Sequence, residues 1–204
     1  MAKERLKSPR ARLFVALDLP DEVREGIVNW QRDALDDPVL RPVKPESLHM
    51  TLVFLGYHPV KQIERVAEAA IEVDDRAPEI RLDPEPVGVP RGRRPRLFAL
   101  DAPSEGAVEL QSQVERRLVE ARFYEPEKRP FWPHLTVARV RPERRGSRKP
   151  APVETPPGPL PEQLFRPFSA VRLTLYRSHL RPQGAEYIPM AVKDLKPAES
   201  TTER

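Results

Sequence analysis

Two segments of the sequence decide the fold, 48-LHMTLVFLG-56 and 134-HLTVARV-140. Each is a largely apolar run that holds a His-x-Thr triplet, and such a run predicts a strand. Successive side chains of a strand point to opposite faces. His49 and Thr51 therefore share one face, as do His134 and Thr136, while the residues between them point into a core. The sequence thus predicts an imidazole and a hydroxyl side by side on each of two rigid strands.

The segments around these two strands predict helices and strands in a repeating order. Apolar residues recur at helical spacing after Pro20, Pro59 and Ser104, and Ser104 is a typical N-cap. The strand from Leu48 is expected to end at Gly56. Further strands are predicted at Leu13–Leu17, Ile80–Val89, Arg96–Leu100, Phe168–Ser178 and Tyr187–Val192. Helix-then-strand units appear in both halves, which suggests a duplicated α+β unit with two lobes.

The chain is expected to form one domain, residues 12–193, between a basic flexible tail at 1–11 and a flexible tail at 194–204. Within the domain, six prolines fall between Pro150 and Pro161. We therefore expect the stretch 141–161 to be a Pro-rich basic loop.

Composition narrows the class of protein. The chain has 204 residues, a formal net charge of +4 and no cysteine. Disulfides and thiolate metal sites are thereby excluded, and the charge gives a mild bias towards anionic partners. No apolar run approaches the ~20 residues that a membrane span needs. The basic N-terminus lacks the apolar stretch of a secretory signal, so we expect a cytoplasmic protein.

Two imidazoles suit the opening of a cyclic phosphodiester. That reaction needs a water deprotonated on one side of phosphorus and a leaving alkoxide protonated on the other. Histidine titrates near neutrality, so one neutral and one protonated His perform both transfers. Nothing in this scheme requires a metal or a cofactor. The sequence also lacks HExxH, GxxxxGK[ST] and GxSxG, which argues against zinc hydrolysis, P-loop phosphoryl transfer and an α/β-hydrolase.

The other histidines are given no chemistry. A single His in a strand is more often structural than catalytic, and only the repeat of the His–Thr pair reverses those odds. His58 lies in a stretch that reads as a turn, and His179 ends a predicted strand, where it is a weak candidate for the rim of a pocket.

At these motifs the chain resembles the two-histidine (2H) phosphoesterases, in particular the RNA 2′,3′-cyclic phosphodiesterase branch, also called 2′-5′ RNA ligase-like. The resemblance covers most of residues 12 to 193. It is carried by 12-RLFVALDLP-20, 48-LHMTLVFLG-56, 129-RPFWPHLTVAR-139, 173-LTLYRS-178 and Tyr187. It implies a bilobal α+β fold of duplicated helix-plus-antiparallel-sheet units, with the motifs facing each other across a cleft.

The resemblance also implies hydrolysis of the cyclic end to a 2′-phosphate, with His49 as proton donor and His134 as proton acceptor. Thr51 and Thr136 are expected to bind the phosphate. Arg129, five residues before His134, is a further candidate for phosphate binding, and Phe131 is a candidate for stacking on a base. An ordinary surface arginine and a core phenylalanine are equally good interpretations of these two residues.

The partners predicted are RNA ends or nucleoside 2′,3′-cyclic phosphates, bound by a monomer. Basic residues cluster in a turn, at Arg91, Arg93, Arg94 and Arg96, and again across Arg139–Lys149. They are either solvated loops or a track for the RNA backbone. Two other functions stay open: an RNA-binding protein without turnover, and a phosphoesterase for another cyclic or 2′-5′-linked nucleotide.

Overall fold

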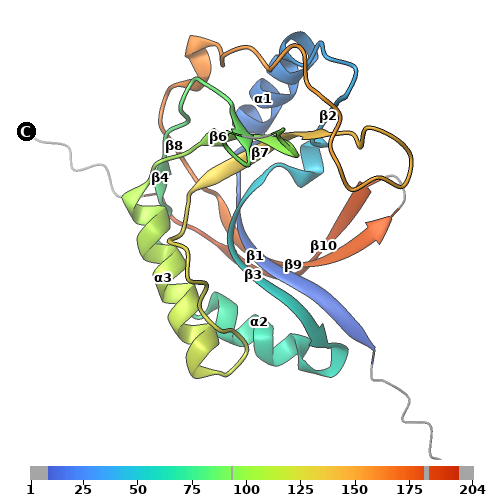
Figure 1. Ribbon diagram of the computed structural model, residues 1–204. Coiled ribbons are helices and arrows are strands. Elements are labelled where there is room, and N and C mark those ends of the chain that lie inside the picture. Colours follow the sequence, from blue (N-terminus) through green and yellow to red (C-terminus); the bar gives the residue numbers. More distant parts are fainter. Residues whose placement is uncertain (1–8, 93, 182–183, 198–204) are drawn as a thin grey trace, which may run out of the picture.

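The computed structural model describes residues 9–92, 94–181 and 184–197 (Figure 1). Its helices are α1 (Asp21–Ala34), α2 (Ile63–Ile71) and α3 (Glu105–Glu120), with short 3-10 turns at Pro45–Ser47, Val60–Gln62 and Glu162–Leu164. Its strands are β1 (Arg10–Asp18), β2 (Leu40–Pro42), β3 (His49–Pro59), β4 (Glu79–Ile80), β5 (Val87–Val89), β6 (Leu97–Asp101), β7 (His134–Val140), β8 (Phe168–Ser169), β9 (Arg172–Arg181) and β10 (Gly184–Asp194).

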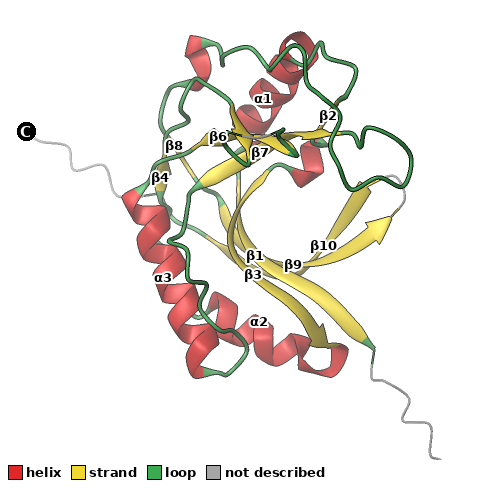
Figure 2. Ribbon diagram, viewed as in Figure 1, coloured by secondary structure: helices red, strands yellow, loops and turns green. Residues whose placement is uncertain are grey.

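Two antiparallel sheets form the two lobes, which confirms the predicted bilobal α+β fold. One sheet has the order β10-β9-β1-β3 and the other the order β2-β7-β6-β5, and β4 and β8 pair separately. Figure 2 shows the first sheet below the second, with α1 beside the upper sheet and α2 and α3 beside the lower one. The two strands that carry the His-x-Thr triplets, β3 and β7, belong to different sheets.

The helices form where helical spacing predicts apolar stripes. Ile27 and Trp30 of α1 are buried, and so are Val114 and Leu118 of α3. The Ser104 hydroxyl accepts a hydrogen bond from the N–H of Ala107 at 3.1 Å, which confirms the predicted N-cap. No helix within the described ranges is long and apolar enough to cross a membrane.

Several predicted boundaries are wrong. β3 continues past Gly56 to Pro59, because residues 10–13 of β1 offer it a partner there, and Gly56 takes a φ of 74° that only glycine adopts readily. His58 therefore lies in a strand, and His179 lies inside β9 rather than at its end.

The predicted strands 80–89 and 168–178 are each divided. Only β4 and β5 form in the first, where Pro84 and Pro86 offer no N–H to a ladder. In the second, β8 pairs with β4 whereas β9 pairs with β1 and β10. Residues 141–161, all of which the structure describes, form no helix or strand, as expected for a loop.

The described parts of both tails are ordered. β1 already begins at Arg10, and at the other end Leu195 is 8% exposed within the core while Lys196 forms an ion pair with Asp75 at 2.6 Å. The rest of the predicted tails, residues 1–8 and 198–204, lies outside the described residues.

Candidate active site

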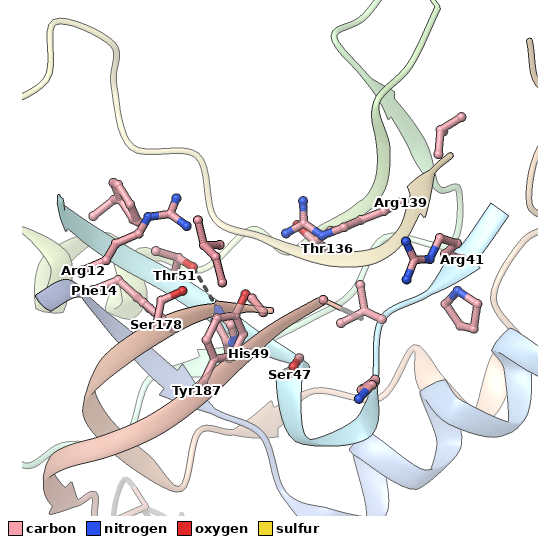
Figure 3. Close-up of a pocket in the computed structure, with 18 of the residues that line it drawn as sticks. Arg12, Phe14, Arg41, Ser47, His49, Thr51, Thr136, Arg139, Ser178 and Tyr187 are labelled. Atoms are coloured by element: carbon pink, nitrogen blue, oxygen red, sulfur yellow. Dashed lines mark hydrogen bonds between the residues drawn. The ribbon is translucent and has the colours of Figure 1, made fainter. Parts of the chain in front are cut away.

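A cleft of about 560 Å³ lies between the two sheets and brings both His–Thr pairs together. β3 contributes His49 and Thr51, and β7 contributes His134 and Thr136. Figure 3 shows Thr136 on the opposite side of the cleft from His49 and Thr51. The period-2 pattern of the sequence thus places each imidazole and its hydroxyl on the cleft face, while Met50 and Leu135 point into the core with 0% exposure.

A β-bulge follows the Thr on each of these strands. On β3 the pairing with β1 skips Leu52, and on β7 the pairing with β6 skips Val137. Leu52 and Val53 are consequently both buried, and so are Val137 and Ala138. The bulge returns the fifth residue after each His to the cleft, because one extra residue exchanges the two faces of the strand. These residues are Phe54 and Arg139.

The bulge on β7 is held by hydrogen bonds from outside its ladder. The carbonyl of Val137 accepts from the N–H of Val43 at 2.9 Å and from the Gln31 side chain at 2.7 Å. Gln31 belongs to α1, so this helix fixes the place where β7 turns Arg139 towards the cleft.

His49 lies in a partly apolar environment. Its ring stacks on Phe14 with centroids 5.0 Å apart, and the edge of Tyr187 meets it at 5.3 Å. Its Nε2 lies 3.2 Å from the hydroxyl of Thr51. Burial lowers the pKa of His49 to about 4; a hydrogen bond to the Ser47 backbone opposes this fall, while the charges of Arg139 and His134 add to it.

His134 is fixed from two directions. Its Nδ1 lies 2.7 Å from the carbonyl of Trp132, which can only accept a hydrogen bond. A neutral His134 therefore carries its proton on Nδ1 and has its lone pair on Nε2. The indole of Trp132 stacks on the ring at 4.0 Å with an interplanar angle of 13°. Burial lowers the pKa of His134, whereas the bond to Trp132 and the charge of Asp101 raise it.

Cations gather along the same cleft. They are Arg12, Arg41, Lys44, Arg139 and Arg141. Of these, only Arg139 and Arg141 fall in a basic segment singled out in the sequence. In the basic turn, Arg91 and Arg94 lie 2.9 and 3.7 Å from the carboxylates of Asp101 and Glu143, and Arg93 lies outside the described residues.

Arg129 and Phe131 do not join the cleft. The Arg129 side chain is 89% exposed and lies 3.9 Å from Glu127. Phe131 packs against the hydrophobic core. The exposed aromatic residue of the cleft is instead Phe54, which is 40% exposed and has the guanidinium carbon of Arg12 4.5 Å from its ring centroid.

The described side chains include no group of three or more His, Cys, Asp or Glu arranged to bind a metal ion. Within these ranges the cleft offers two imidazoles, the hydroxyls of the two threonines and of Ser47, Ser178 and Tyr187, and a set of cations. Such groups can transfer protons and hold an anion.

Comparison with known proteins agrees with this geometry. Residues 17–96 match the family model described as LigT like phosphoesterase. An RNA 2′,3′-cyclic phosphodiesterase of Thermus thermophilus is 31% identical over 183 residues, which cover 86% of this chain and 86% of that protein. One from Escherichia coli K12 is 27% identical and covers 88% of this chain and 93% of its own length. A solved structure from Thermus thermophilus superposes with a TM-score of 0.73 at 29% identity, covering 90% of this chain and 97% of that one. As the resemblance at the two His-x-Thr strands implied, the chain belongs to the LigT-like phosphoesterase family.

Proposed function

We propose that this chain hydrolyses 2′,3′-cyclic phosphates of RNA ends or nucleosides to 2′-phosphates. The observation that carries the proposal is the meeting of two His-x-Thr strands, one from each sheet, in a single cleft lined by cations. The family relatives described above are RNA 2′,3′-cyclic phosphodiesterases, which supports the same substrate class here.

In the proposed reaction His134 accepts a proton from water, whose oxygen forms a new bond to phosphorus. The bond from phosphorus to the 3′ oxygen breaks, and His49 gives that oxygen a proton. The lone pair on Nε2 of His134 suits it to the first step, because Nδ1 is occupied by the Trp132 carbonyl. The direction of the two transfers rests on the family resemblance.

The charge of the phosphorane-like transition state needs donors on the non-bridging oxygens. Thr51 and Thr136 supply hydroxyls from both sides of the cleft. Arg139 supplies the cation in place of Arg129, since it lines the cleft with them.

The lining of the cleft has both aromatic and cationic parts, which suits a nucleotide. Phe54, with Arg12 on its ring, offers a face on which a base can stack. Lys44 and Arg141 also line the cleft and can meet the phosphates of a longer RNA. The monomeric state, the cytoplasmic location, the independence from metals and the domain limits stay predictions from the sequence.

The decisive experiment is turnover of a nucleoside 2′,3′-cyclic phosphate followed by phosphorus NMR. The expected product is the nucleoside 2′-phosphate alone. Binding without any turnover would indicate an RNA-binding protein, and faster turnover of a 2′-5′-linked dinucleotide would indicate the other phosphoesterase function. A 3′-phosphate product would contradict attack opposite the 3′ oxygen.

A further inference from the structure

A carboxylate lies behind the imidazole of His134. Asp101, the last residue of β6, pairs in register with His134, the first residue of β7. Asp101 Oδ1 accepts a hydrogen bond from the indole Nε1 of Trp132 at 2.5 Å. Trp132 in turn stacks on His134 and accepts a hydrogen bond from it through its carbonyl. One residue therefore contacts both the carboxylate and the imidazole.

Asp101 is itself held by a cation. Its Oδ2 accepts a hydrogen bond from Arg91 at 2.9 Å, and its side chain is 24% exposed, against 67% for that of Arg91. With both carboxylate oxygens engaged, the Asp101 side chain has little freedom to rotate, and the indole is held flat against His134. Arg91, an arginine of the basic turn, thus holds the side chain of Asp101.

The other lobe contains a related arrangement. Asp18 ends β1 and pairs with His49. It accepts hydrogen bonds from the hydroxyls of Tyr176 and Thr174, each at 2.8 Å, and lies 3.3 Å from Arg172. The ring centroids of Tyr176 and His49 lie 6.1 Å apart, and Phe14 stacks on both rings. An aspartate, an aromatic donor and an arginine thus accompany each imidazole, but only Trp132 touches its imidazole face to face.

We propose that Asp101 and Trp132 are positioning residues for His134, with Arg91 fixing Asp101, and that together they hold the imidazole in the orientation and tautomer that its proton transfer needs. The proposal rests on the proposed function for its effect on turnover, but the coupling of Asp101 to His134 is measurable without turnover. Neither side chain lines the cleft, so neither is expected to touch the substrate.

The charge of Asp101 raises the pKa of His134. The charged and titratable groups that face His134 are Asp101 from β6, His49 from β3 across the cleft and Arg139 on β7 itself. Asp101 is the only anion of these three, and it favours the protonated imidazole. Removing its charge should move the titration of His134 to lower pH.

The fluorescence of Trp132 can report the titration of His134, because the two rings are stacked. The chain has one other tryptophan, Trp30, which can be replaced. In Trp30→Phe the stacked Trp132 is the only indole, and a protonated imidazole in contact with an indole quenches its fluorescence. The fluorescence should fall as the pH drops through the pKa of His134. Adding His134→Gln should abolish this transition, and adding Asp101→Asn should shift its midpoint to lower pH.

The ring signals of His134 in NMR give the same midpoint without Trp30→Phe, should that variant not fold. The proposal would be overturned if His134 titrated with the same midpoint in the Asp101→Asn variant as in the chain that keeps Asp101. So would the persistence of the transition in His134→Gln, since the reported group would then not be His134.

Turnover separates positioning from mere stability. Asp101→Asn keeps an acceptor for the indole, and Trp132→Phe keeps a flat ring but no N–H. Each should lower kcat about 10- to 100-fold, as loss of a group that orients a functional imidazole does, with KM unchanged. Trp132→Leu should fall further than Trp132→Phe. Trp30→Phe, which removes a comparable bond from an indole to the Pro159 carbonyl, is the matched control and should keep its kcat.

Unchanged kcat in Asp101→Asn and Trp132→Phe, or a rise in KM alone, would refute the positioning role. If the unaltered chain did not hydrolyse the cyclic phosphate, the proposed function would fail, while the fluorescence and NMR titrations would still test the contact between Asp101, Trp132 and His134.

Discussion

Replacing His49 by glutamine should change how the stability of the protein depends on pH. The pKa of His49 falls from an ordinary 6.5 to about 4 in the fold, mainly because the ring is buried. Between pH 6.5 and about pH 4, His49 therefore binds a proton in the unfolded chain but not in the folded chain. Stability is full above pH 6.5 and is lost as the pH falls towards 4, because protons favour the unfolded state across that window.

The magnitude follows from the pKa difference. One pH unit corresponds to ~1.4 kcal/mol, so the full difference is worth at most roughly 3 to 4 kcal/mol. Because His49 borders the open cleft, solvent should reduce this to about 2 kcal/mol. The free energy of unfolding falls in both proteins as the pH drops from about 7 to about 4. This fall should be about 2 kcal/mol smaller in His49→Gln than in the unaltered chain. Carboxylates that titrate in the same window contribute equally to both and cancel.

Urea unfolding curves at pH steps of about half a unit measure this difference directly. Thr51→Val is the matched control: it removes the neighbour of the His49 Nε2 but keeps the imidazole, so its pH dependence should follow that of the unaltered chain. Parallel curves for His49→Gln and the unaltered chain would refute the reasoning, since the buried ring would then not resist protonation.

Further predictions concern the activity. His49→Ala and His134→Ala should each lose ~10²–10⁴-fold in kcat, and Thr51→Ala less, as measured on a nucleoside 2′,3′-cyclic phosphate; near-normal activity of either His variant would contradict the mechanism. Turnover should survive exhaustive chelation, and loss with EDTA that one divalent ion restores would disprove the metal-free scheme. Lys44→Ala and Arg141→Ala should raise KM for an oligonucleotide with a cyclic end and flatten its salt dependence, but leave the mononucleotide unaffected. A substrate with sulfur as the 3′ bridging atom should rescue His49→Ala and leave His134→Ala slow, whereas the opposite rescue would reverse the two roles.

The sequence alone predicts the two lobes and both His–Thr pairs because they depend on local periodicity. Residues two apart on a strand share a face whatever the rest of the chain does. Arg139 could not be predicted in this way, since it lies five residues after His134 and a regular strand would turn it into the core. The bulge that reverses its direction depends on α1, through Gln31 and the Val137 carbonyl. Long-range contacts of this kind leave no mark in the local pattern.

The prediction for Arg129 depends on its distance from His134 along the chain, which has little meaning in an irregular segment, and Phe131 lies in the same segment. The residues before β7 form neither helix nor strand, so no periodicity fixes the direction of their side chains. For the same reason, the role of Trp132 could not be predicted from the sequence. It lies two residues before the histidine, and only the pairing of β6 with β7 shows that its indole meets Asp101 and His134. A strand end next to a motif is where sequence spacing informs least and tertiary pairing most.

Two similar lobes supply two similar imidazoles, yet an acid–base pair needs two different protonation states. The differences arise from the neighbours: His49 is packed among aromatic rings and faces the charge of Arg139, whereas His134 has Asp101 behind it. In the free cleft these neighbours make His49 the harder of the two to protonate, although the family resemblance makes it the donor. We expect a bound phosphate to resolve this, because a negative charge next to Thr51 would favour the charged form of His49 and offset the effect of Arg139. The proton donor would then be completed by the substrate itself, which keeps His49 neutral until an anion occupies the cleft.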